Sequence, residues 1–436
     1  MDNKLWQKNH SSQTSWSVLV NEFTAGKDRS FDEILAEYDV LGSKAHCLML
    51  LKSGLLISED YLLLDQALNE ILADVQSGNF KIQDGVEDIH SQIEFLLTQK
   101  IGEAGKKIHT ARSRNDQVLV DLKLYFKHEI KHLVQNIETL FNQFINLSEQ
   151  NKTKYMPGYT HFQLAMPSSF GLWFGAYAEA LTEDLEWLAV AYSISNKNPL
   201  GSAAGYGSSF PIHRGITTQV LDFTTMNYNS MYAQMTRGKT EKAVAIALAS
   251  VAATLSKFSY DVILFLNQQF DFISFPSDLS TGSSIMPHKK NPDVFELIRA
   301  KSNRIQAIPN ELTILLNNLP SGYHRDFQLT KEIIFPALKE LKECLKMMSL
   351  MLEKIIIKDH ILADPKYNVI FSVEEINKLV EQGVSFREAY RQVAESIDNG
   401  SFQPEKNILH THEGSLGNLC NDQIIEAFNK VKLNMK

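Results

Sequence analysis

The sequence predicts an all-α protein built around a central bundle of long helices. The 436 residues include only 21 glycines and 12 prolines, and a chain with so few helix breakers can form long uninterrupted helices. Apolar residues also recur every three or four positions over long stretches, which is the period of one helix face. Several such stretches in one chain are typical of a helical bundle.

The composition excludes several classes of protein. The net charge of −8 argues against a nucleic-acid binder, which needs a dense basic face for phosphate contacts. The three cysteines lie far apart and form no CxxC pair, so we expect free thiols in a reducing compartment. The N-terminal residues lack the apolar core of a signal peptide, and the longest apolar run is too short to cross a bilayer. We therefore expect a cytoplasmic protein without a membrane partner.

The first expected domain spans residues 1–107 and consists of short amphipathic helices. Residues 58–60 (Ser-Glu-Asp) have the composition of a helix start, and residues 77–79 (Ser-Gly-Asn) that of a helix end. Glycine favours helix ends because it adopts the left-handed conformation that a C-terminal cap requires.

Residues 108–358 are expected to form the central bundle domain. The first long helix should begin near Val118 and run for about 30 residues, since apolar side chains follow in steps of three or four. We expect the others over 170–192 and 240–266, from Pro292, and from near Lys331. The helix over 240–266 is apolar nearly all round, so other helices must surround it, which predicts association of several chains through the bundle. Residues 359–436 should form a small helical C-terminal domain.

Three polar segments interrupt the long helices, at 109–117, 157–163 and 281–292. Each joins an expected helix start to hydrogen-bond donors and cations, and helix N-termini attract carboxylates. Asn291 is expected to be an N-cap, with Pro292 at the first helical position. Arg112 and Arg114 can clamp carboxylates with two hydrogen bonds each, and Lys289 supplies a point charge. Together the segments predict a site for a polyanionic small molecule.

Each segment also has a simpler interpretation when taken alone. Paired arginines are usually surface ion pairs, a single histidine is usually structural, and serines beside a glycine usually form a turn. Nucleotide cofactors find no support, because the chain has neither a Walker A sequence nor a G-x-G-x-x-G motif. A metal at residues 410–413 (His-Thr-His-Glu) is less expected than a solvated turn, since no partner cluster matches it.

The motifs carry a specific resemblance. Residues 282–292 (GSSIMPHKKNP) resemble the signature loop of the aspartase/fumarase superfamily. Residues 109–117 (HTARSRNDQ), 157–163 (PGYTHFQ), 319–331 (LPSGYHRDFQLTK) and 384–389 (VSFREA) are similar to the argininosuccinate lyase family within it. The resemblance covers nearly the whole chain.

The resemblance implies three mostly helical domains and a homotetramer with a 20-helix core, in which each active site is shared by three chains. It implies β-elimination of argininosuccinate to arginine and fumarate, a step of arginine biosynthesis, without cofactor or metal. Two alternatives remain: a sister lyase that releases fumarate from another adduct such as adenylosuccinate, and a non-enzymatic structural protein on the same scaffold.

The resemblance also implies roles for individual residues. Ser283 and His161 match the catalytic serine and histidine, in either order of base and acid; Glu296 matches the partner carboxylate of the histidine, and Lys289 favours the serine alkoxide. Substrate-binding positions are matched by Asn115, Thr160, Tyr323, Gln328 and Lys331, and carboxylate partners by Arg114, Lys289 and Asn291. Where the family often has a serine that contacts substrate, this chain has Asp28, an acid better suited to the arginine half than to carboxylates.

Overall fold

The computed structural model describes residues 15–282 and 284–435. The all-α prediction is confirmed, because helices dominate the described residues and their strands are short, the longest being the seven-residue β2 (Gln163–Ser169).

All five predicted long helices are present, and they are α6 (Arg114–Gln150), α7 (Phe170–Ser195), α10 (Lys239–Leu266), α11 (Asp293–Leu315) and α12 (Leu329–Leu352). The start of α6 lies four residues before the predicted one. The predicted cap of α11 is wrong, because the helix begins after Pro292 and the backbone of Asn291 instead belongs to the short strand β7. Pairing with Thr281 in this ladder removes Asn291 from the helix terminus.

The chain divides into two compact units, each built from three segments. Unit 1 comprises Met1–His132, Leu188–Ala249 and Ile305–Glu340, and unit 2 comprises Leu133–Trp187, Ser250–Arg304 and Leu341–Lys436. The boundaries fall within the five long helices, so each of these helices contributes residues to both units. The division into domains 1–107, 108–358 and 359–436 stays a prediction.

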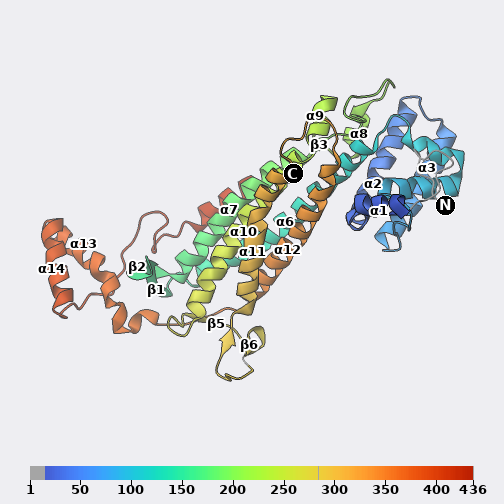
Figure 1. The fold of residues 1–436 in the computed structure, drawn as a ribbon. Coiled ribbons are helices and arrows are strands. Elements are labelled where there is room, and N and C mark those ends of the chain that lie inside the picture. The colour runs from blue at the N-terminus through green and yellow to red at the C-terminus, as the bar shows by residue number, and fades with distance from the viewer. Residues whose placement is uncertain (1–14, 283, 436) are drawn as a thin grey trace. The chain divides into compact units, whose positions relative to one another are not determined.

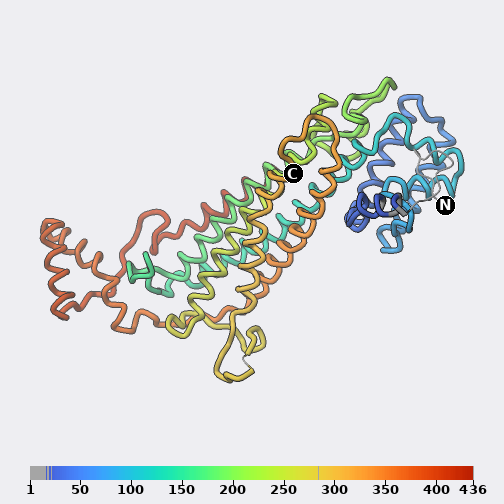
Figure 2. The backbone as a smooth tube through the Cα atoms, viewed as in Figure 1, coloured from blue at the N-terminus to red at the C-terminus, as the bar shows by residue number. Residues whose placement is uncertain are grey.

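In unit 2 the five long helices pack side by side as a bundle (Figure 2). Phe144 of α6 contacts Phe258 of α10, with ring centroids 4.9 Å apart, and lies against Phe174 of α7. The Ser256 hydroxyl of α10 donates to Asn303 of α11 over 2.8 Å. Gln143 Nε2 of α6 donates to a main-chain carbonyl of α12 over 3.2 Å. Aromatic packing and interhelical hydrogen bonds therefore hold this part of the bundle together.

Unit 2 also contains the β1–β2 hairpin and a peripheral helix pair, α13 with α14, that is visible in Figure 1. The pair buries a small apolar core of Ile376, Ala389 and Val393. The remaining elements of this unit are β1 (Tyr155–Thr160), β5 (Ile273–Ser274), η2 (Ser277–Leu279), β6 (Thr281–Gly282), β7 (Lys290–Asn291), β8 (Ile356–Ile357), η4 (Ile361–Ala363), η5 (Pro365–Phe371), α13 (Ser372–Glu381), α14 (Phe386–Asp398) and α15 (Asn421–Leu433).

Unit 1 has its own core where α2, α3 and α4 meet. Val40, Leu50, Leu64, Leu68 and Ile93 are almost completely buried there. The predicted start and end of the helix at 58–76 are confirmed by α3. The elements of this unit, besides its parts of the long helices, are α1 (Ser15–Ala25), α2 (Asp28–Lys52), α3 (Ser58–Gln76), α4 (Ile89–Ile101), α5 (Glu103–Lys106), η1 (Lys107–His109), β3 (Lys197–Asn198), α8 (Arg214–Val220), β4 (Thr225–Met226), α9 (Ser230–Met235) and η3 (Arg325–Gln328).

The segment Ser230–Leu266, which includes α10, is long and apolar enough by composition alone to cross a membrane, with a mean hydropathy of 1.4 in its most apolar window. Half of that window is buried inside the protein. The core helix of a helical bundle has the same composition, because neighbouring helices surround it.

Candidate active site

A polar pocket of about 190 Å³ in unit 1 brings together five of the residues predicted to bind substrate. The first turn of α6 supplies two of them, η3 with the loop before it supplies two more, and α12 supplies the fifth. These residues are Arg114, Asn115, Tyr323, Gln328 and Lys331. Segments more than 200 residues apart in the sequence thus converge on one cavity.

Lys331 lies at the centre of the strongest charge cluster of this pocket. Its side chain is only 3% exposed, and its Nζ forms ion pairs with Asp32 and with Asp28, the latter over 2.7 Å. Burial alone would lower the pKa of Lys331, but Asp32 and Asp28 outweigh it and raise that pKa. Lys331 is therefore a permanent cation with two carboxylates beside it.

Arg114 is held by acidic residues that sequence reasoning did not single out. Its guanidinium forms ion pairs with Asp88 over 3.0 Å and with Glu87 over 3.5 Å, and it donates to the Ser91 hydroxyl. Burial would raise the pKa of Asp88, but the positive charges of His90 and Arg114 outweigh it and lower that pKa. Arg112, the second predicted clamp, does not line the pocket; it is buried and donates to the Ser43 hydroxyl.

Hydrogen bonds fix the other side of the pocket. Gln328 Nε2 donates to the carbonyls of Thr24 and Ala25, at the end of α1, and Gln328 Oε1 accepts from Arg325. Arg237 forms a buried ion pair with Glu241 over 2.8 Å, and its guanidinium also donates to the Phe327 carbonyl in η3. The backbone that carries Gln328 is therefore anchored by a buried arginine that is itself held in an ion pair.

Behind the pocket lies a buried network that sequence reasoning missed. His90 lines the pocket, and its Nδ1 bonds to Asp39, while Gln117 Nε2 donates to both Asp39 oxygens over 3.1 Å. Asp121 lies 3.9 Å from the same His90 nitrogen. Asp121 follows Val118 by three positions on the expected apolar face of α6, and a carboxylate on that face was the available signal.

The charges in this network are unevenly shared. Burial would raise the pKa of Asp39, but His90 outweighs it and lowers that pKa, so Asp39 and His90 form a buried ion pair. Burial and the neighbouring Asp39 charge raise the pKa of Asp121 well above its ordinary value. The surroundings therefore favour the protonated form of Asp121 beside the ionised Asp39.

In unit 2, Thr160 and His161 lie at the tip of the β1–β2 hairpin, where both side chains are exposed. The two turn residues, His161 and Phe162, have φ values of 54° and 58°. Such left-handed conformations are uncommon for histidine and strained for phenylalanine, and strained backbone concentrates at functional sites. A register shift between Pro157 and Tyr159 precedes the tip.

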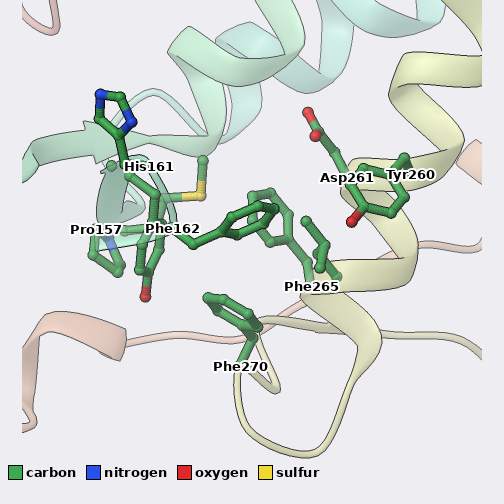
Figure 3. Close-up of a pocket in the computed structure, with 11 residues that line it drawn as sticks. Pro157, His161, Phe162, Tyr260, Asp261, Phe265 and Phe270 are labelled. Atoms are coloured by element: carbon green, nitrogen blue, oxygen red, sulfur yellow. The ribbon is translucent and has the colours of Figure 1, made fainter. Parts of the chain in front are cut away.

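The hairpin tip also borders an aromatic pocket of about 390 Å³. Figure 3 shows the His161 ring pointing away from this pocket, whereas Phe162 points toward Phe265 and Phe270. The aromatic residues therefore support the turn from one side and leave the imidazole available to a ligand on the other.

The signature loop connects α10 with α11 in unit 2 and projects beyond these helices in Figure 1. Its ends pair as β6 and β7, which places Asn291 half-buried at the base and Lys289 exposed in the loop. Glu296 is exposed on the first turn of α11. Ser283, the predicted catalytic serine, lies outside the described residues. Among the described residues, no hydrogen bond or ion pair joins His161 to Glu296 within one chain.

The predicted site residues therefore form three groups: a charged pocket, a strained hairpin tip and an exposed loop. The pocket can bind a small molecule that carries both carboxylate and cationic groups, since its arginines and lysine lie beside acids. The exposed histidine can exchange protons, and the loop supplies a lysine and an amide for a negative charge.

Comparisons with known proteins find relatives that cover most of the chain. A family model described as lyase matches residues 15–307. The argininosuccinate lyase of Phocaeicola vulgatus is 53% identical over 440 residues, covering 98% of this chain and 97% of that relative. That of Thermotoga neapolitana is 38% identical over 398 residues, covering 91% and 98%.

Solved structures share the fold at low identity. An EDDS lyase variant with bound fumarate aligns with a TM-score of 0.74 at 18% identity, covering 95% of this chain and 89% of that chain. The 3-carboxy-cis,cis-muconate lactonizing enzyme from Pseudomonas putida aligns with a TM-score of 0.71 at 14% identity, covering 96% and 98%. At these identities the alignments establish the fold alone.

Proposed function

Because the chain belongs to the argininosuccinate lyase family, we propose that it splits argininosuccinate into arginine and fumarate by β-elimination. The observation that carries the proposal is the unit 1 pocket, where five residues at family substrate positions meet among paired acids and cations. Argininosuccinate itself carries three carboxylates, an ammonium and a guanidinium, so such a mixed lining suits it. The reaction belongs to arginine biosynthesis and takes place in the cytoplasm.

The proposed chemistry begins with removal of a proton from the succinyl carbon next to a carboxylate. The carbanion spreads its charge onto that carboxylate, and donors aimed at this charge supply the main stabilisation. We assign this role to Lys289 and Asn291. Ser283 and His161 serve as the base and acid pair, in either order, and the acid protonates the departing guanidino nitrogen. Glu296 orients the histidine and raises its basicity.

We further propose that the chain works as a homotetramer in which three chains contribute to each active site. The helix α10 is apolar on most of its surface, as a bundle core shared by several chains requires. In such an assembly, His161 and Glu296 of different chains can meet although they are unpaired within one. Light scattering of the pure protein would return the mass of four chains, whereas a stable, active monomer would refute the shared site.

The reaction is tested by following fumarate absorbance after adding argininosuccinate to the purified protein. We expect turnover by the wild type and none by Ser283→Ala or His161→Asn. Assembly should be unchanged in His161→Asn because that side chain is exposed at the hairpin tip. Lys366→Ala, which removes an exposed ion pair elsewhere in unit 2, serves as the control. Faster turnover of adenylosuccinate than of argininosuccinate would favour the sister lyase, and the absence of any turnover from a folded tetramer would favour a structural protein.

A further inference from the structure

Asp28 lines the unit 1 pocket from the first position of α2 and faces a lysine that already has a partner. The Asp32 side chain, 4% exposed, forms the inner ion pair with Lys331, while the Asp28 side chain is 18% exposed. Asp28 is therefore the member of this trio that a ligand in the pocket can reach.

The pocket also has one carboxylate more than its cations balance. Two of the cations that line it are left out of this count, because Arg237 is neutralised by Glu241 and His90 by Asp39. The carboxylates that remain are Asp28, Asp32, Glu87 and Asp88, and the cations are Arg114, Arg325 and Lys331. The pocket therefore carries one excess negative charge, and of the two acids paired with Lys331, Asp28 is the one whose side chain is more exposed.

We propose that Asp28 is a specificity-determining residue that selects substrates with an α-ammonium group, an inference that rests on the proposed function. Asp28 Oδ1, which is itself buried, and Lys331 Nζ lie 2.7 Å apart, so a negative and a positive charge stand side by side in the pocket wall. The head group of an amino acid presents the same two charges in reverse order. Lying antiparallel to this ion pair, it places its ammonium on Asp28 and its carboxylate on Lys331. A ligand without the ammonium meets a lysine already neutralised twice.

Charge balance at Lys331 does not require Asp28, because Asp32 already supplies one counter-charge. Burial and the like charge of Asp32 act against the ionised form, and they raise the pKa of Asp28 to about 6 although Lys331 and Arg237 oppose them. Groups that are unfavourable for stability are typical of binding sites. The charged groups that face Asp28 are Lys331 of α12, Asp32 of its own helix, and Arg237.

The test compares argininosuccinate with its analogue in which hydrogen replaces the α-amino group, using the assembled enzyme and its Asp28→Asn variant. We expect the substitution to raise KM for argininosuccinate about tenfold to hundredfold, the loss of one charge-assisted hydrogen bond. The KM of the analogue should change less than about twofold, and the melting temperature should stay the same or rise. Asp60→Asn is the matched control, since Asp60 pairs with Lys107 in unit 1 and does not line the pocket.

An equal rise of KM for both substrates, or no rise for either, would overturn the role of Asp28. A wild-type enzyme that cleaves neither substrate would refute the proposed function instead. In that case calorimetric titration of wild type and Asp28→Asn with L-arginine and with 5-guanidinopentanoate decides the Asp28 inference separately. A weaker affinity of the variant for L-arginine alone supports the inference, and any other pattern rejects it.

Discussion

Two neighbouring buried acids, Asp39 and Asp121, should respond in opposite ways to the same substitution. Asp39 is fully buried and carries the negative charge opposite His90, with Gln117 bonded to both of its oxygens. Asp121 is equally buried, and neither of its oxygens accepts a hydrogen bond from the described residues. Asn can replace a neutral carboxylic acid in shape and as a donor, but it cannot replace a charge.

The expected magnitudes follow from this difference. Asp39→Asn leaves His90 as an unpaired buried cation and should lower the free energy of unfolding by about 3–5 kcal/mol. Asp121→Asn replaces a neutral acid by a neutral amide of the same shape, and at about pH 4, where the wild-type acid is protonated, it should change the free energy of unfolding by less than about 1 kcal/mol. Both are read from the melting temperatures of the two variants and the wild type at equal protein concentration, since association shifts apparent stability.

The pH dependence of stability provides a second test of the charge state of Asp121, because the direction of the change can be predicted. The pKa of Asp121 is higher in the folded than in the unfolded chain, so the folded state binds more protons and this residue makes stability fall as pH rises above about 4. Asp121→Asn lacks this loss and should therefore gain stability relative to wild type as pH rises above about 4. If Asp121→Asn is as damaging as Asp39→Asn, then Asp121 is ionised and our assignment of the charges is wrong.

Three further predictions concern packing and pH. Gly171→Ala should lower the free energy of unfolding by about 3 kcal/mol, because its Cβ would lie 2.5 Å from another backbone atom, whereas Gly215→Ala in α8 has open space and should be neutral or slightly stabilising in the same melting assay. In the wild type, kcat/KM for argininosuccinate should fall as pH decreases through about 6, because Asp28 becomes protonated, and Asp28→Asn should show no such fall in a pH–rate profile. Glu241→Gln should destabilise the fold by about 3–5 kcal/mol in thermal unfolding, since it leaves Arg237 buried without its counter-charge; a change below about 1 kcal/mol would contradict this.

The long helices could be predicted from sequence because their signal is local and repeated. Each turn of α6 or α12 contributes another apolar residue at the same spacing, so errors are confined to the ends. The start of α11 illustrates the limit. Asn291 has the composition of a cap, but its backbone pairs with Thr281, a contact that depends on how the preceding loop folds back.

For the candidate site, the sequence identified individual residues but not the partners that surround them in the fold. The motifs identified Arg114 and Lys331, but not Asp88 and Asp32, which neutralise them from distant positions in the sequence. The β1–β2 hairpin was expected as a polar segment without strands, because its positive φ values fall on His161, which composition does not mark as a turn residue. Long-range charge pairing and backbone strain arise only once the chain has folded.

The register shift between Pro157 and Tyr159 makes the length of the β1 strand as critical as the identity of its last residues. Alternate residues of a strand face opposite sides of the sheet. Losing one residue at the irregularity would therefore turn the His161 imidazole to the other face, although His161 and its neighbours at the tip would keep their identities. Variant libraries for this enzyme should therefore keep the number of residues between α6 and α7 constant, and a natural homologue with a gap there should be examined for a relocated tip histidine before its activity is assumed.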